Sequence, residues 1–149
     1  MWRIWGMIAM ADKDYFVING EKRFDKEKIE QFCRDHGIAL YDTAEEVVRL
    51  KDNASDNFLQ IVTATDIASL LEQIPLCHTI AATGQKSAET LQSIIGCGPL
   101  AVGQHTETSF AGRKISVWRM PSSSRAYPLA ISKKAEAYHK MFLSLTHQR

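Results

Sequence analysis

The stretch Thr79-Ile80-Ala81-Ala82-Thr83-Gly84 runs directly into residues 85–95, and together they decide the expected fold. The first five residues form a short apolar run of the kind that becomes a buried strand, and Gly84 favours a turn after it. Residues 85–95 are expected to form a helix that ends at Gly96. A strand that leads straight into a helix is half of a strand–helix–strand unit, which predicts an α/β protein.

Similar patterns predict the other elements on either side of this unit. Helices are expected at residues 2–10, 25–36, 44–50, 67–74 and 132–146, and strands at 38–41, 106–110 and 114–120. The last two strands are expected to form a hairpin through 111–113, and residues 51–57 a loop. This alternation predicts a three-layer sandwich, with a mainly parallel central sheet flanked by helices. The length of 149 residues predicts one domain, residues 1–149.

The composition is that of an ordinary globular protein, with 45% hydrophobic and 23% charged residues. These fractions argue against a disordered chain, a collagen-like repeat and a disulfide-rich scaffold. The first apolar run, residues 4–11, is interrupted by Gly6 and is shorter than the ~20 residues that span a bilayer, so no membrane segment is expected. Cys33, Cys77 and Cys97 lie far apart, which predicts reduced thiols and a cytoplasmic protein.

Charge is distributed unevenly along the chain. Residues 1–112 contain ten basic and sixteen acidic residues, whereas residues 113–149 contain eight basic residues and one acidic residue, Glu136. The two parts therefore carry formal charges of −6 and +7, within a total of +1. A basic segment of this kind indicates either a polyanionic partner near the C-terminal segment or a solvated helix face.

A parallel sheet places binding sites at the carboxyl ends of its strands, so the residues that follow each strand are the first candidates. We call the residues that follow a strand its exit. Three exits are expected to lie side by side: residues 41–43, 83–86 and 120–126. The last contains Met120-Pro121-Ser122-Ser123-Ser124-Arg125, in which a proline stiffens the chain, small residues expose amides and hydroxyls, and an arginine reaches beyond them. These features suit a phosphate backbone; the alternative is an ordinary serine-rich turn with an exposed arginine.

This motif, with Lys133-Lys134-Ala135-Glu136-Ala137-Tyr138 after a short spacer, resembles the second motif and the last helix of the uracil-DNA glycosylase superfamily. The mismatch-specific uracil and thymine glycosylases and the deoxyinosine glycosylases are the most similar branches. Three further segments are similar to elements of that family: 37–42 to a strand, 66–75 to a helix, and 82–86 to the residues at the end of a strand. Residues 1–6 are similar to the family's Asn-x-Phe-Trp region, and the match begins partway through that region. The resemblance therefore covers nearly all of the chain.

The resemblance implies a DNA repair enzyme that flips a damaged or mispaired base (uracil, thymine or hypoxanthine) out of double-stranded DNA and hydrolyses the bond between base and sugar. It implies neither a metal nor a cofactor. The residues that it assigns to DNA binding are Pro121, Ser122, Ser123, Ser124, Arg125, Lys133 and Lys134. Those that it assigns to the base pocket are Tyr41, Asp42, Gly84 and Gln85. In this scheme Arg125 fills the gap left by the flipped base and Asp42 reads the base edge; alternatively, Asp42 caps the helix expected after it.

No catalytic residue can be assigned, because the sequence lacks the family's first motif. Relatives begin with an additional strand and a Gly-x-x-Pro loop that positions the attacking water, with an Asn or Asp nearby. The resemblance here starts at Met1, after that motif, so we expect an N-terminally truncated sandwich with impaired excision and surviving DNA binding. The alternative is a noncatalytic DNA-binding or protein-interaction module, which docks a partner or a second copy of the chain through an exposed sheet edge.

Other site chemistries receive little support from the sequence. The histidines at 78, 105, 139 and 147 lack the spacing of zinc ligands. The serine tract lacks the Gly-x-Ser-x-Gly turn that presents a hydrolase nucleophile, and no histidine is placed recognisably as its base. We therefore expect neither a metal site nor a hydrolase triad.

Overall fold

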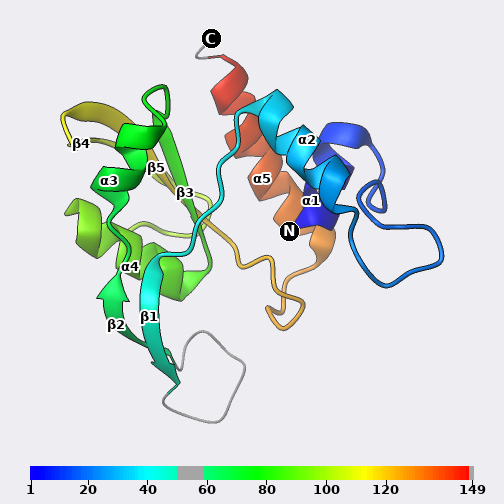
Figure 1. Cartoon of the computed structure of the whole chain (residues 1–149), viewed down its shortest axis with the longest axis horizontal. Coiled ribbons are helices and arrows are strands. Elements are labelled where there is room, and N and C mark those ends of the chain that lie inside the picture. The colour runs from blue at the N-terminus through cyan, green and yellow to red at the C-terminus, as the bar shows by residue number, and fades with distance from the viewer. Residues whose placement is uncertain (50–58, 148–149) are drawn as a thin grey trace. The chain divides into compact units, whose positions relative to one another are not determined.

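The computed structural model describes residues 1–49 and 59–147, and its contacts divide the chain into two compact units (Figure 1). Unit 1 combines Met1–Tyr41 with Ser123–Arg149, and unit 2 is Asp42–Ser122. Unit 1 holds the helices α1 (Trp2–Met10), α2 (Lys26–His36) and α5 (Ile131–Thr146). Unit 2 holds β1 (Ala44–Arg49), β2 (Leu59–Ala64), α3 (Ile67–Gln73), β3 (Thr79–Thr83), α4 (Gln85–Ile95), β4 (His105–Phe110) and β5 (Arg113–Met120). The predicted α/β class is confirmed.

The central sheet of unit 2 has three strands in the order β3-β5-β4. β3 and β5 are parallel, with Thr83 opposite Met120, and β4 pairs with β5 as an antiparallel hairpin. Ala111 and Gly112 both have positive φ, 50° and 76°, which is the backbone of the two-residue turn that suits a twisted hairpin. The strand–helix unit at 79–95 and the hairpin are thus confirmed, whereas the sheet is mixed rather than mainly parallel.

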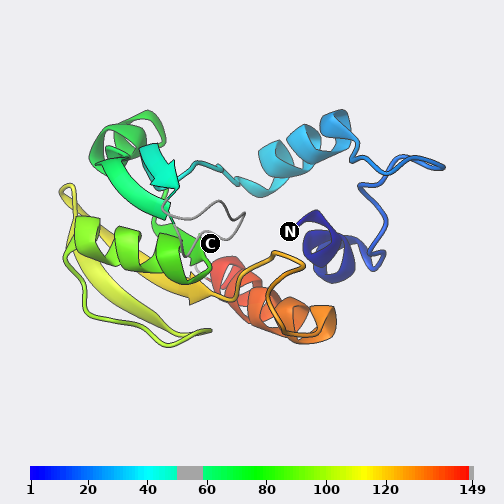
Figure 2. The ribbon, with the colours of Figure 1, turned by 90° about the horizontal axis from the view of Figure 1, so that it is seen from below.

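Helix α4 packs on β3 and β5 (Figure 2). Its apolar side shares one hydrophobic core with the sheet and α3. The buried members of this core are Ile67, Leu71, Ala82, Ala88, Leu91, Ile95, Ile115 and Val117. α4 ends at Gly96, whose φ of 78° is a left-handed conformation that glycine adopts without steric strain. α3 begins at Asp66, whose carboxylate accepts a hydrogen bond from the Ser69 amide at 3.1 Å.

Arg113, the first residue of β5, holds the C-terminal end of α3. Its guanidinium donates hydrogen bonds of 2.9 to 3.2 Å to the carbonyl oxygens of Leu71, Ile74, Pro75 and Cys77. Carbonyl groups at a helix C-terminus lack helical partners, and a positive charge there also complements the helix dipole. The side chain therefore stabilises the helix end and ties it to the sheet.

Residues 44–49 form a strand, β1, where the sequence pattern predicts a helix. β1 pairs antiparallel with β2 in a separate two-stranded sheet, with Ala44 opposite Ala64. Two adjacent valines favour a strand, and a helix this short is unstable by itself. The pairing depends on β2, which the sequence analysis does not identify, so the helix prediction is wrong. The loop expected at 51–57 lies outside the described residues.

Residues 38–41 do not form the expected strand. They connect α2 to β1 without regular structure, and Leu40 and Tyr41 are 51% and 67% exposed. A strand needs a hydrogen-bonded neighbour along its length, and this segment has no position in the described sheet order β3-β5-β4. The short apolar run therefore stays exposed, and the central sheet lacks one expected member within the described residues.

Unit 1 is built around aromatic side chains from its helices. Trp5 is 4% exposed, and its ring lies 5.8 to 6.0 Å, between centroids, from the rings of Phe32, Tyr138 and Phe142. α1 and α5 contact each other, and all three helices lie within one residue of their predicted bounds. Within residues 1–49 and 59–147, no helix combines the length and the apolar composition needed to cross a membrane.

Candidate nucleic-acid interface

Two of the three expected strand exits lie side by side, at the carboxyl ends of β3 and β5. The Gly84 amide donates to the Met120 carbonyl at 3.1 Å, which extends the parallel ladder one step beyond β3. Gly84 has a φ of 104°, and a Cβ at this position would lie 3.6 Å from the Cβ of Ser122. Gln85 follows at the exposed start of α4, where its amide donates to the Glu89 carboxylate at 2.9 Å. The residues after the two strands are therefore immediate neighbours, as parallel pairing predicts.

The third expected exit is not part of this edge. Asp42 precedes β1 of the two-stranded sheet, and its carbonyl accepts a hydrogen bond from Thr65 Oγ1 at 2.6 Å. The segment after Asp42 is a strand, so the alternative that Asp42 caps a helix is wrong. Tyr41 lies in the irregular segment before it. Of the four residues assigned to the base pocket, the central sheet brings only Gly84 and Gln85 to the β3–β5 edge.

The serine tract moves from the interior to the surface along its length. Pro121 is buried, Ser122 and Ser123 are half-buried, and Ser124 and Arg125 are exposed. The boundary between the two units falls between the first two serines. The proline end is thus anchored while the arginine end is accessible, an exposure that fits both alternatives drawn from the sequence.

Residues 123–127, here called the arginine turn, are held by hydrogen bonds to one carbonyl oxygen. The Ser124 carbonyl accepts from Lys134 Nζ at 2.7 Å and from the Tyr127 amide at 3.2 Å. Lys134 is 4% exposed, and its Nζ also lies 5.5 Å from the centroid of the Tyr127 ring. The turn therefore has a well-defined backbone, with Arg125 at its tip.

The burial of Lys134 changes the role that the resemblance assigns to this residue. Its ammonium satisfies a carbonyl oxygen of the arginine turn, so it positions the turn instead of facing solvent. Lys133 is exposed and pairs with Glu136, with 3.3 Å between Nζ and Oε2. Helix periodicity is the signal that separates the two lysines, because the buried residues of α5 are Lys134, Ala135, Tyr138 and Met141.

The Ser123 hydroxyl is hydrogen-bonded to the buried phenol of Tyr138. Burial raises the pKa of Tyr138, and the hydrogen bond from Ser123 opposes that rise. The phenol therefore stays neutral over the physiological pH range. This pair gives the arginine turn a second attachment to α5.

The arginine turn lies in a region of concentrated positive charge. α5 begins shortly after it, and the first turn of α5 contains Lys133 and Lys134 but no acidic residue. The N-terminus of a helix already carries partial positive charge, so cations there favour a nearby anion. No ion pair within residues 1–49 and 59–147 involves Arg125. The arrangement therefore offers a guanidinium on a fixed turn to a phosphate or carboxylate.

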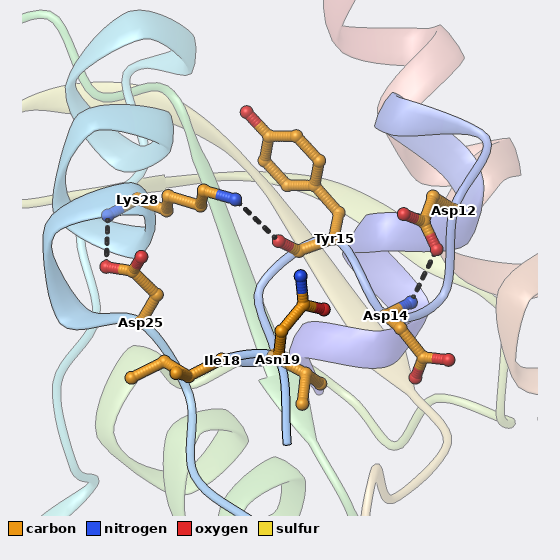
Figure 3. Close-up of a pocket in the computed structure, with 8 residues that line it drawn as sticks. Asp12, Asp14, Tyr15, Ile18, Asn19, Asp25 and Lys28 are labelled. Carbon is orange, nitrogen blue, oxygen red and sulfur yellow. Dashed lines mark hydrogen bonds between the residues drawn. The ribbon is translucent and has the colours of Figure 1, made fainter. Parts of the chain in front are cut away.

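A pocket of about 300 Å³ in unit 1 is absent from the sequence predictions (Figure 3). It is lined by Asp12, Asp14, Tyr15, Val17, Ile18, Asn19, Asp25 and Lys28. Asp12 accepts a hydrogen bond from the Asp14 amide at 2.9 Å, and Asp25 accepts one from the Lys28 amide at 3.2 Å. These carboxylates repel phosphate, so the pocket is not part of the candidate interface. The described residues contain no group of three or more side chains arranged to hold a metal ion.

Comparison of the chain with protein-family models, with curated proteins and with solved structures gives no match. The resemblance to the uracil-DNA glycosylases therefore rests on the motifs quoted above, chiefly the serine tract and the helix that follows it. To these motifs the fold adds two adjacent strand exits and an arginine turn with a defined backbone.

Proposed function

We propose that this chain is a DNA-binding domain of the uracil-DNA glycosylase type, which binds double-stranded DNA at a damaged or mispaired base through the arginine turn. One observation carries the proposal: Arg125 is exposed at the tip of a turn whose backbone is held by the buried Lys134. The motif resemblance supports DNA, rather than another anion, as the partner.

A fixed turn suits this role because little conformational freedom is lost on binding. The Arg125 guanidinium donates paired hydrogen bonds to a phosphate and stays charged at every physiological pH. Ser122 and Ser124 are the neighbouring candidates for further phosphate contacts. Lys133 is exposed but paired with Glu136, and Lys134 acts as a positioning residue.

The enzymatic part of the proposal is hydrolysis of the N-glycosidic bond of a flipped uracil, thymine or hypoxanthine. Gly84 and Gln85 are the candidates for lining the base, because Gly84 lies beside Ser122 at the β3–β5 edge and Gln85 follows it at the exposed start of α4. Asp42 and Tyr41 enter the proposal through the resemblance alone. The proposal assigns no residue to positioning the attacking water.

The three-layer sandwich expected from the resemblance belongs to the same proposal. It is supported by β5, which is buried on both faces. Ile115 and Val117 face the core shared with α4, and Trp118 and Met120 are buried on the opposite face. A strand that is buried on both faces is typical of the centre of such a sandwich.

Fluorescence anisotropy with labelled duplexes tests the binding proposal. Arg125→Ala is expected to weaken binding about tenfold, because a charge-assisted hydrogen bond to phosphate is lost. The slope of log affinity against log salt is expected to fall by ~0.9, the contribution of one phosphate contact. Arg34→Ala is the matched control, since it removes the same charge from an exposed position on α2. Equal affinities and slopes for the two variants would contradict the proposal.

Base excision is tested on duplexes that contain U:G, T:G or hypoxanthine:T pairs, with protein in molar excess. Alkaline cleavage of the resulting abasic sites is the readout. We expect cleavage at the altered base and none in an undamaged duplex. Cleavage no greater than in protein-free samples would contradict the enzymatic part and leave binding as the function.

An open edge of the central sheet favours a second candidate, a noncatalytic interaction module. Within the described residues β3 pairs only with β5, and the His78 carbonyl and the Gly84 amide both bond to that neighbour. Because the backbone groups of successive residues point to opposite sides of a strand, the amide of Ala81 points to the other edge. A second copy of the chain that pairs along this edge would form a homodimer.

Sedimentation analysis tests this second candidate. Ala81→Pro removes the edge donor at a position where an edge strand tolerates proline. If the candidate is right, the wild type forms dimers at micromolar concentration and the variant does not. A wild type that remains monomeric over the same concentrations would contradict it.

A further inference from the structure

Tyr127 is an exposed aromatic residue of the arginine turn, and one face of its ring is already occupied. Lys134 Nζ lies 5.5 Å from the ring centroid, and Lys134 itself is buried. Tyr127 keeps 36% of its surface exposed. The ammonium takes up one face of the ring, so a ligand that stacks on Tyr127 would use the opposite face.

The backbone at Tyr127 is held by hydrogen bonds on both sides. The Tyr127 amide donates to the Ser124 carbonyl at 3.2 Å, and the Tyr127 carbonyl accepts from the Leu129 amide at 2.8 Å. Because this backbone is already ordered, less conformational entropy is lost when a flat ligand stacks on the ring. More of the stacking energy therefore contributes to affinity.

The buried cation also selects the kind of ligand that the ring accepts. A second cation on the exposed face would be repelled by the Lys134 ammonium, whereas a neutral aromatic group gains dispersion energy and buries apolar surface. An unpaired nucleobase is such a group, and it is linked to a phosphate that suits Arg125, two residues before Tyr127. A base within an intact duplex has both faces covered by its neighbours.

We propose that Tyr127 stacks on an unpaired base of DNA while Arg125 contacts the phosphate backbone beside it. This inference rests on the proposed function and adds the feature that the turn recognises, which is an exposed base face in a single strand or at a mispaired site. Single-stranded DNA is therefore expected to bind more tightly than a fully paired duplex of the same length.

The test uses the intact chain with a short single strand that carries one 2-aminopurine, and with the same strand in a fully paired duplex. Stacking quenches the fluorescence of 2-aminopurine, and anisotropy gives the affinity for each probe. Tyr127→Leu is expected to weaken single-strand binding about tenfold, to abolish the quenching, and to leave duplex affinity within about twofold. Tyr127→Phe keeps the ring and should match the wild type. Phe24→Leu changes an exposed aromatic residue outside the turn and is the control.

Three results would overturn the inference in distinguishable ways. If Tyr127→Leu lowers the affinity for both probes equally, the ring only supports the turn and does not stack. If the wild type does not quench 2-aminopurine but still binds duplex in an Arg125-dependent way, the inference fails and the proposed function stands. Absence of Arg125-dependent binding to either probe would overturn both.

Discussion

A single buried side chain, Lys134, organises the candidate interface. Its apolar stem is buried with the hydrophobic side of α5, and its ammonium donates to the Ser124 carbonyl at 2.7 Å. Removal of that ammonium would take away one of the two hydrogen bonds that the Ser124 carbonyl accepts, and with it this attachment of the turn to α5. In the proposed function, Lys134 therefore acts through the conformation of the turn, and Arg125 makes the direct contact with DNA.

Lys134→Met tests this positioning role, because it keeps most of the apolar stem and removes the charge. We expect the free energy of unfolding to fall by about 1–3 kcal/mol and the affinity for DNA to fall with it. Urea unfolding followed by circular dichroism measures the first quantity, and anisotropy the second. Lys140→Met, at an exposed position of the same helix, should change stability by less than about 0.5 kcal/mol. Wild-type stability and affinity in Lys134→Met would show that this lysine does not hold the turn.

At the scale of elements, α3 depends on contacts at both of its ends. At its N-terminus Asp66 accepts hydrogen bonds from the Ser69 amide at 3.1 Å and the Ser69 hydroxyl at 2.8 Å, and these hold the pKa of the carboxyl below its usual range. At its C-terminus the Arg113 guanidinium bonds to four carbonyl oxygens. A helix of seven residues is unstable alone, so these contacts and the burial of Ile67 and Leu71 keep it folded.

Arg113→Met is expected to lower the free energy of unfolding by about 2 kcal/mol, because several carbonyl groups lose a charged donor. Arg113→Lys should recover only part of this loss, since one ammonium cannot reproduce the geometry of the guanidinium fork. Urea unfolding measures both changes. Lys114→Met, at the exposed next residue, is the control. Equal stabilities for Arg113→Met and Lys114→Met would show that the helix end does not depend on Arg113.

At the scale of the whole molecule, unit 1 is discontinuous, because all of unit 2 lies between its two segments in the sequence. α1 and α5 nevertheless contact each other. Bringing two segments together across a long intervening chain costs less conformational entropy when that chain is already folded. We therefore predict that the two units unfold together. This is the behaviour expected if residues 1–149 form a single domain.

Tryptophan fluorescence measures this coupling. Trp2 and Trp5 belong to unit 1 and Trp118 belongs to unit 2. In a Trp118→Phe variant the fluorescence reports on unit 1 alone, while circular dichroism of the same variant reports on both units. We expect the two urea transitions to coincide. A fluorescence transition separated from the circular dichroism transition would show that the units unfold independently.

Part of the candidate site could be predicted from the sequence. The adjacent exits of β3 and β5 follow from the strand–helix unit and its parallel pairing, and the exposure of Arg125 follows from the polar, serine-rich segment around it. The position of Asp42 could not be predicted. It depends on the pairing of β1 with β2, which places Asp42 next to Thr65 and outside the central sheet.

The sequence by itself determined the helices with strong end signals. Asp25 caps α2 through its carboxylate, and Gly37 ends that helix with a φ of 64°. A cap and a left-handed glycine act within one helical turn, so the sequence neighbours contain the whole interaction. Only the tertiary structure decided that residues 44–49 pair as a strand, that 38–41 do not, and that Lys134 is buried under the arginine turn. Strand partners and the surroundings of a buried charge come from distant parts of the chain, so local sequence cannot specify them.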